Sequence, residues 1–205
     1  MPNLHTDTPS AGSSRERLLA AAKHLIAEEG YERVSTAAIA REAGTSESQL
    51  VRYFGTKAGL LETIFDESWA PINPELTRLV AASTTAHEAT IAILAAMINV
   101  CERDPDLAKL LFFESRRLRG DTAEVQLSKG FLDFSKLVVH LIERGQKDGS
   151  FSQALQPIAV CSALLGAAEG MIRDRLLATN QHQPPPFPQS QIRTIFEAIV
   201  TGLRP

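Results

Sequence analysis

Residues 35–54, STAAIAREAGTSESQLVRYF, restrict the fold of this chain more than any other stretch. Ser35 stands just before a helical run, where its side chain can accept a hydrogen bond as an N-cap. Gly44 follows that run, and a left-handed glycine lets the chain turn sharply. Ser46 can then cap the next helix. The stretch therefore predicts two short helices joined by a tight turn.

Three side chains indicate how these two helices pack. Leu50 and Phe54 lie on the inner stripe of the second helix, and the small residue Ala40 lets that helix cross closely over the first. The pattern predicts a helix-turn-helix, whose second helix lies in the major groove of DNA. An ordinary pair of helices inside a bundle is the alternative.

The chain resembles the tetracycline-repressor (TetR) family of bacterial regulators over residues 15–69, which cover that family's N-terminal DNA-binding domain. The matching segments are IAREAGTS and LVRYFGTKAGLL, preceded by AAKHLIAEEGYERVS. The resemblance implies that Thr36 and Lys57 contact phosphate, and that Gln49 lies on the recognition helix. The DNA-contacting residues that we expect are Ser35, Thr36, Thr45, Ser46, Glu47, Ser48, Gln49, Arg52, Tyr53 and Lys57.

Two positions depart from the family pattern. Val51 stands where a Tyr is common, so one phosphate-contacting hydroxyl group is absent. Tyr53 stands where a His is common, and it keeps a ring and a polar tip. We therefore expect contacts to the operator that differ from those of other members.

Charge does not by itself predict nucleic-acid binding. The 205-residue chain has a net charge of −3, and residues 1–57 carry seven basic and seven acidic side chains. Attraction to DNA must therefore come from how the charges are arranged on one face. The sequence shows no signal peptide and no apolar run of membrane-spanning length, so we expect a cytoplasmic protein with no membrane partner.

Helical periodicity along the chain predicts an all-α fold of about nine helices. We expect a disordered tail over residues 1–13, a helix-turn-helix DNA-binding domain over 14–70 and a ligand-binding and dimerisation domain over 71–205. Pro71 and Pro74 predict that the helix beginning near Lys57 breaks or ends there.

The second domain contains five further helical patterns. We expect helices over residues 86–103, from Pro105 to Gly120, from Asp121 to Gly149, from Pro157 onward and from residue 188 or 189. Asp121 and Glu124 have the spacing of a capping box.

The helical pattern that begins at Pro157 is apolar over more than one face and contains several small residues, and the last pattern is too apolar for a terminal helix on the surface. The resemblance implies that they pair with their copies in a four-helix homodimer interface. Burial of the first one within a single subunit is the alternative. The interface residues that we expect are Leu165, Ala168, Ile172, Ile192, Ile195, Phe196 and Ile199.

The apolar stripes of the second domain can also line a pocket for a small molecule. The resemblance implies such an effector cavity, whereas for any single residue the pattern alone favours a filled core. The lining residues that we expect are Met97, Phe112, Phe113, Phe131, Phe134, His140 and Met171.

No phosphate-binding loop, dinucleotide-binding turn, nucleophile elbow or metal-ligand spacing occurs in the sequence. We therefore expect no enzymatic activity, no cofactor and no metal. The sequence favours a TetR-type transcriptional regulator, a dimeric repressor that binds a palindromic operator and is released by a small, largely apolar effector. The alternative is a small helical ligand-binding or enzymatic domain whose helix-turn-helix is only structural.

Overall fold

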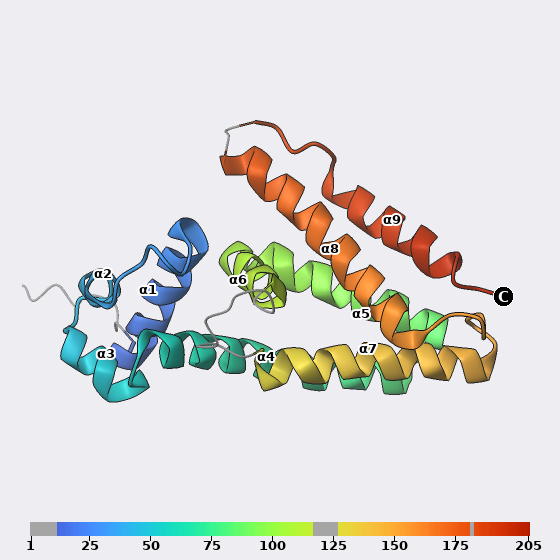
Figure 1. Cartoon of the computed structure of the whole chain (residues 1–205), viewed down its shortest axis with the longest axis horizontal. Helices are drawn as coiled ribbons and strands as arrows, with labels where there is room; N and C mark the ends of the chain where they lie inside the picture. The colour runs from blue at the N-terminus through green and yellow to red at the C-terminus, as the bar shows by residue number, and fades with distance from the viewer. Residues whose placement is uncertain (1–11, 117–126, 181–182) are drawn as a thin grey trace, which may run out of the picture.

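A computed structural model describes residues 12–116, 127–180 and 183–205. The described residues form an all-α fold (Figure 1). Its helices are α1 (Ser14–Glu29), α2 (Thr36–Glu42), α3 (Glu47–Phe54), α4 (Lys57–Ala82), α5 (Ala86–Arg103), α6 (Pro105–Arg116), α7 (Lys129–Asp148), α8 (Pro157–Asn180) and α9 (Gln189–Thr201). The all-helical prediction is confirmed. Among the described residues, no helix is long and apolar enough to cross a membrane.

Side-chain caps explain where several helices begin. The Ser13 and Glu16 side chains form a capping box at the start of α1, and Thr85 and Glu88 form another at the start of α5. Gly149 follows α7 in the left-handed conformation, with φ of 80°, which a side chain would disfavour. These helix ends are therefore determined by local sequence.

The prediction that Pro71 and Pro74 break the fourth helix is wrong, because α4 runs through both of them to Ala82. Both prolines are exposed, so the carbonyl groups that lose their helical partners can face water. The opposite side of α4 is a continuous buried stripe, which includes Ile72 and Leu76. Packing of this stripe outweighs the local cost of the prolines, and the boundary predicted at residues 70 and 71 falls inside one helix.

The seventh helix also begins later than its pattern suggests. α7 starts at Lys129, where the Ser128 hydroxyl accepts a hydrogen bond from the backbone N–H of Phe131 at 3.2 Å. Leu127, expected inside the helix, precedes it. The expected helix start at Asp121 and Glu124, the expected end of the preceding helix at Gly120 and the proposed tail up to residue 11 lie outside the described residues.

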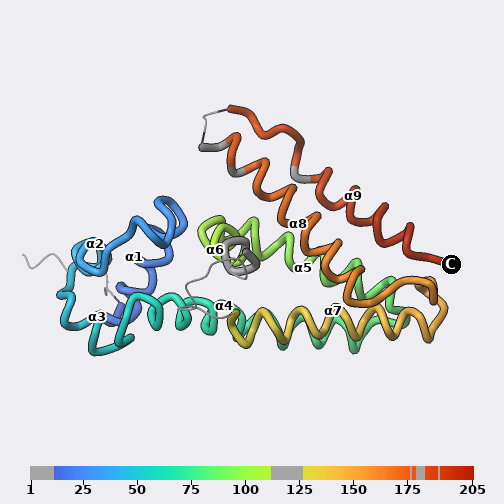
Figure 2. The backbone as a smooth tube through the Cα atoms, in the orientation of Figure 1, coloured from blue at the N-terminus to red at the C-terminus, as the bar shows by residue number. Residues whose placement is uncertain are grey.

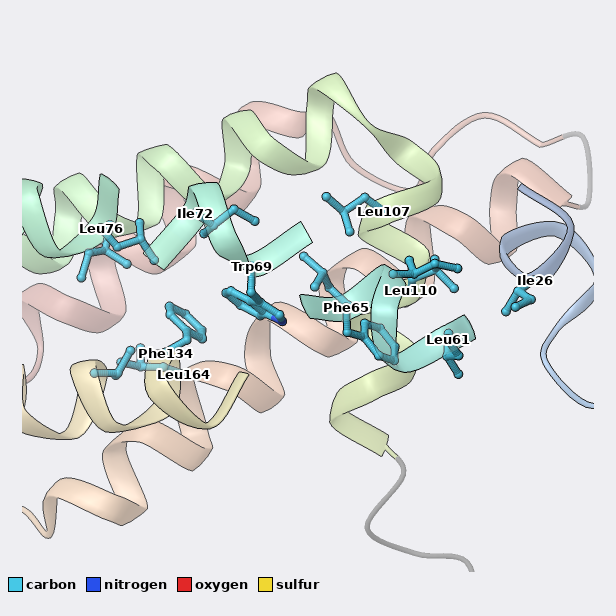
Figure 3. Close-up of a cluster of buried hydrophobic side chains, with 14 of the residues drawn as sticks. Ile26, Leu61, Phe65, Trp69, Ile72, Leu76, Leu107, Leu110, Phe134 and Leu164 are labelled. Atoms are coloured by element: carbon cyan, nitrogen blue, oxygen red, sulfur yellow. The ribbon is translucent and has the colours of Figure 1, made fainter. Parts of the chain in front are cut away.

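The helices form two regions that share α4. α1 to α3 lie together at one end, and α4 leads from them into the second region, where α7 and α5 pack beside it (Figure 2). α8 and α9 lie next to one another and cross above the α4 and α7 layer. Figure 3 shows Leu61, Phe65, Trp69, Ile72 and Leu76 of α4 running through the buried cluster. The helix α4 therefore belongs to the cores of both regions.

Candidate DNA-binding face and ligand cavity

The corner between α2 and α3 is built from backbone turns and two serine caps. The Ser35 hydroxyl accepts a hydrogen bond from the Ala38 N–H at 3.1 Å, and the Ser46 hydroxyl accepts one from the Gln49 N–H at 3.3 Å. Gly44 lies between them with φ of +59°. The predicted caps and turn are confirmed, and they aim α3 at a fixed angle from α2.

Packing beneath the corner holds α3 in place. Leu50 is completely buried, and Ile39 and Ala40 of α2 are buried opposite it. A larger side chain at position 40 would push the two helices apart. The inner side of α3 is thus rigidly supported, which leaves its outer side free to meet a partner.

The predicted DNA-contacting residues lie at the N-cap of α2, on α2, on α3, at the turn that joins these two helices or at the start of α4. Six of them are exposed, namely Ser35, Ser46, Glu47, Ser48, Arg52 and Tyr53, and four are half-buried, namely Thr36, Thr45, Gln49 and Lys57. The structure therefore brings this set together at one end of the molecule.

Hydrogen bonds already order part of this face. The Thr36 hydroxyl donates to the Glu47 carboxylate, which links the first residues of α2 and α3. The Ser46 and Ser48 hydroxyl groups lie 2.9 Å apart. The Arg52 guanidinium group lies 5.1 Å from the centre of the Tyr53 ring and donates to its hydroxyl at 3.3 Å.

Lys57 has a structural role that the sequence did not indicate. Its ammonium group donates to the carbonyl oxygens of Tyr31 at 2.9 Å and of Val34 at 3.0 Å. It also lies 4.2 Å from the centre of the Tyr31 ring. A lysine ammonium group carries three N–H donors, so one donor remains to reach a phosphate. Because the two acceptors are backbone carbonyl groups between α1 and α2, no residue-type pattern could have predicted this contact.

A cavity of about 180 Å³ lies among α4 to α9. Three of the predicted effector residues, Met97, Phe131 and Phe134, line it. Trp69 also lines it, stacked on Phe134 with ring centres 5.3 Å apart. Further lining residues are Thr90, Ile93, Leu94, Ile98, Cys101, Ala108, Leu111, Val138, Leu141, Leu164, Leu165, Ala168, Glu169, Ile172, Ile192, Phe196 and Val200.

The other four predicted effector residues do not contribute to the described lining. His140 is exposed on α7, and Met171 is half-buried on α8 outside the lining. The side chains of Phe112 and Phe113 lie outside the described residues. Helical spacing cannot tell which side of a helix meets a cavity and which meets a neighbouring helix, so it did not identify this division.

The described lining is almost entirely apolar. Its polar side chains are those of Thr90 and Glu169. The Thr90 hydroxyl donates a hydrogen bond to the carbonyl oxygen of Ala86 at 2.8 Å, and Glu169 contributes a carboxylate group. Burial, with a smaller contribution from the Glu102 charge, raises the pKa of the Cys101 thiol to about 11, which keeps it a neutral, unreactive group at neutral pH. The cavity lining is therefore suited to a largely apolar molecule.

Five of the residues predicted for a dimer interface contribute to the cavity lining, and three of these five, Leu165, Ala168 and Ile172, are only half-buried. Leu165, Ala168, Ile172, Ile192 and Phe196 all line the cavity. Ile195 of α9 is 42% exposed, and Ile199 is half-buried. The outer sides of α8 and α9 thus carry the apolar surface that a second copy could cover.

Ion pairs join α1 to the α5–α6 corner and to α6. Lys23 pairs with Asp104, and Glu28 pairs with Lys109. His24 Nδ1 lies 2.9 Å from the Asp106 carboxylate. The hydrogen bond to Asp106, together with the charges of Asp106, Glu28 and Glu42, raises the pKa of His24. The same helix α6 lines the cavity with Ala108 and Leu111, so it contacts both regions.

Comparison with known proteins agrees with this architecture. Residues 18–64 match the family model of bacterial regulatory proteins of the tetR family. The nucleoid occlusion factor SlmA of Vibrio vulnificus (strain YJ016) is 26% identical over 182 residues, which cover 83% of this chain and 87% of that protein. SlmA of Aliivibrio fischeri (strain MJ11) is 26% identical over 183 residues, covering 86% of this chain and 91% of the relative.

Solved structures share the fold at low sequence identity. The fatty acid degradation regulator FadR from Bacillus halodurans has a TM-score of 0.77 and 18% identity, with 94% of this chain and 96% of that chain covered. The regulator FadR from Bacillus subtilis, solved in complex with stearoyl-CoA, has a TM-score of 0.75 and 16% identity, with 91% and 97% covered.

Proposed function

The chain belongs to the TetR family of bacterial regulators, and from this premise we propose that it is a dimeric repressor released from a palindromic operator by a small, uncharged effector. The observation that carries the proposal is the outer side of α3, which is exposed and carries mostly polar side chains, while Leu50 on its inner side is completely buried. A helix so supported can enter a groove without disturbing the core.

Contacts to DNA divide into two kinds under this proposal. Thr36 and Lys57 hold phosphate groups and set the register, while Ser48 and Gln49 face base edges. Arg52 lies beside the backbone of the DNA. Because Lys57 also bonds two backbone carbonyl oxygens, its loss affects the position of α4 as well as a phosphate contact.

Dimerisation would place two recognition helices about 34 Å apart, one for each half-site. The support for it is the outer surface of α8 and α9, where Ile195 is exposed and Gly166 has open space in front of its Cα. We place the interface there, around Ile195 and Ile199, while Ile192 and Phe196 serve the core of the chain. Replacing Ile195 and Ile199 with Lys is expected to give a monomer in light scattering.

Leu132 provides a matched control for this variant, because it is also 42% exposed but lies on α7. Leu132→Lys should leave the dimer intact. A dimer that persists in the Ile195→Lys and Ile199→Lys double variant would contradict this position of the interface.

The effector class follows from the cavity. The described lining contains no Lys or Arg, so it offers no cation to a phosphate or carboxylate group. An acyl chain or another uncharged aliphatic group fits this chemistry. The relative from Bacillus subtilis was solved with stearoyl-CoA; in this chain the cavity would take only the acyl part of such a ligand.

Release would require the ligand to prefer one arrangement of the two regions, because only differential affinity shifts an equilibrium. Two helices can carry that preference to the DNA. α4 lines the cavity with Trp69 and begins at Lys57, and α6 lines it with Ala108 while Lys109 holds α1. A shift of either helix would change the spacing of the two recognition helices.

The DNA-binding proposal can be tested with duplexes selected from a random library by the full chain. Gln49→Ala should reduce the discrimination between the selected operator and random DNA by about 1–3 kcal/mol if Gln49 makes a good base contact. Lys57→Ala should weaken both duplexes alike and flatten the salt dependence. Failure to enrich any sequence, together with turnover of a metabolite by the purified protein, would favour the enzymatic alternative.

A further inference from the structure

The exposed apolar surface of the DNA-binding region is confined to α3. Within the described residues of α1 to α6, the exposed large hydrophobic side chains are Val51 and Tyr53, at 54% and 38%. Elsewhere in these helices, large apolar side chains are buried or half-buried. If α3 enters the groove, an apolar group of the DNA can cover this exposed apolar surface.

Val51 is the more open of the two. The Tyr53 ring is covered by the Arg52 guanidinium group at 5.1 Å and lies 6.0 Å from the Phe54 ring. The Val51 side chain is 54% exposed, and the residues four positions before and after it are engaged elsewhere or lack a side chain. The Glu47 carboxylate accepts a hydrogen bond from Thr36 on α2, and Gly55 has no side chain.

The major groove offers one apolar group to such a side chain, which is the 5-methyl group of thymine. A valine facing the amino group of adenine or cytosine would displace water without replacing its hydrogen bond. Branching at Cβ also restricts the Val51 side chain to few rotamers, so little conformational freedom is lost on contact.

We propose that Val51 is a specificity-determining residue that contacts the 5-methyl group of a thymine in each half-site of the operator. This inference rests on the proposed function, because it requires α3 to lie in the major groove. It gives this position a base contact in place of the phosphate contact that the family resemblance implies for a tyrosine there.

Uracil lacks only the methyl group of thymine, so it isolates the contact. The operator is selected from a random library, and each thymine is replaced by deoxyuridine at the two symmetric positions in turn. One replacement should weaken binding about fourfold per half-site, or about fifteenfold in the palindrome, which is the effect of exposing one methyl-sized group in each.

Val51→Ala should bind the thymine and uracil forms of that operator equally, near the affinity of the original chain for the uracil form. The two proteins and two duplexes make a double-mutant cycle, in which the coupling measures the contact itself. Val51 is exposed, so alanine leaves no cavity, and Leu132→Ala on α7 should keep the full uracil effect.

Three results would overturn the inference. The first is a loss of affinity on uracil replacement that persists in Val51→Ala. The second is a loss that disappears in Tyr53→Ala but remains in Val51→Ala. The third is an operator in which no thymine replacement changes the affinity. Each of these leaves operator binding, and hence the proposed function, intact. A library that yields no enriched sequence would overturn both together.

Discussion

The two regions of this molecule use similar apolar side chains to different ends. In the DNA-binding region of α1 to α3, Leu18, Ile39 and Leu50 are completely buried. Around the cavity, Leu141 and Leu164 are buried, but Leu94, Met97 and Leu165 remain half-buried. A closed core fixes one geometry, whereas incomplete packing leaves room for a ligand and for movement. The comparison indicates that the first region is a rigid DNA-binding unit and that the second region can change its packing around a ligand.

The largest expected effect follows from leucine-to-alanine changes in the two regions. Leu50→Ala should lower the free energy of unfolding by about 2–5 kcal/mol, because the cavity it leaves cannot collapse. Leu165→Ala should cost about 1 kcal/mol, since a half-buried side chain contributes only part of a full burial. Urea denaturation of both variants measures the difference, and equal losses would break the comparison.

The close packing of α4 against α7 gives the next effect. A Cβ atom on Gly130 would lie 2.2 Å from the Trp69 side chain, so Gly130→Ala must separate the two helices. We expect a loss of about 1–3 kcal/mol, with a shift in Trp69 emission.

Gly170→Ala on α8 is the matched control. An added Cβ there meets only the end of the Arg173 side chain, at 3.8 Å, and alanine favours a helix by about 0.5–1 kcal/mol. This variant should be at least as stable as the original chain. If Gly130→Ala left the free energy of unfolding unchanged, α4 and α7 could separate without cost. The conclusion that α4 belongs to the cores of both regions would then be wrong.

The smallest expected effect concerns the contact between the two regions. His24 has a raised pKa in the folded chain, chiefly through its hydrogen bond to Asp106. Its protonated form therefore stabilises the α1–α6 contact at pH values below the ordinary value of 6.5, and the stabilisation is lost as pH rises through the folded-state pKa. The His24 side chain is 57% exposed, so the effect should be only about 0.2–1 kcal/mol.

Comparing the original chain with His24→Gln by urea denaturation measures this difference. The stability advantage of histidine should be present near pH ~5.5 and absent near pH ~8, as expected for an imidazole whose pKa is raised above its usual range. An advantage that grows with pH would contradict the assigned sign.

The helix-turn-helix corner could be predicted from the sequence because its signals are local. Ser35, Gly44 and Ser46 act on residues within one turn of themselves, so the corner and the helix limits followed directly. The continuous α4 was missed because burial of Ile72 and Leu76, a tertiary effect, outweighs the local rule for proline.

The cavity and the outer surface could not be separated in the same way. Ile192, Ile195, Phe196 and Ile199 share one apolar pattern along α9, yet two of them face the core and the other two remain exposed or half-buried. Periodicity identifies an apolar helix but not the neighbour that each side meets. That neighbour depends on α5, α7 and α8, which are distant in sequence.

The central claim is that a ligand in the cavity and an operator on α3 oppose one another. Operator affinity is measured by fluorescence anisotropy with and without decanol, which serves as an uncharged aliphatic probe. Decanol affinity is measured with and without operator from the emission of Trp69, the single tryptophan of the chain. Ala168→Leu, which fills the cavity from α8, is the control and should lose both responses. The account predicts that decanol weakens operator binding by the same factor by which operator weakens decanol binding, as linkage requires. Saturating decanol that changes Trp69 emission but leaves operator affinity unaltered would contradict it.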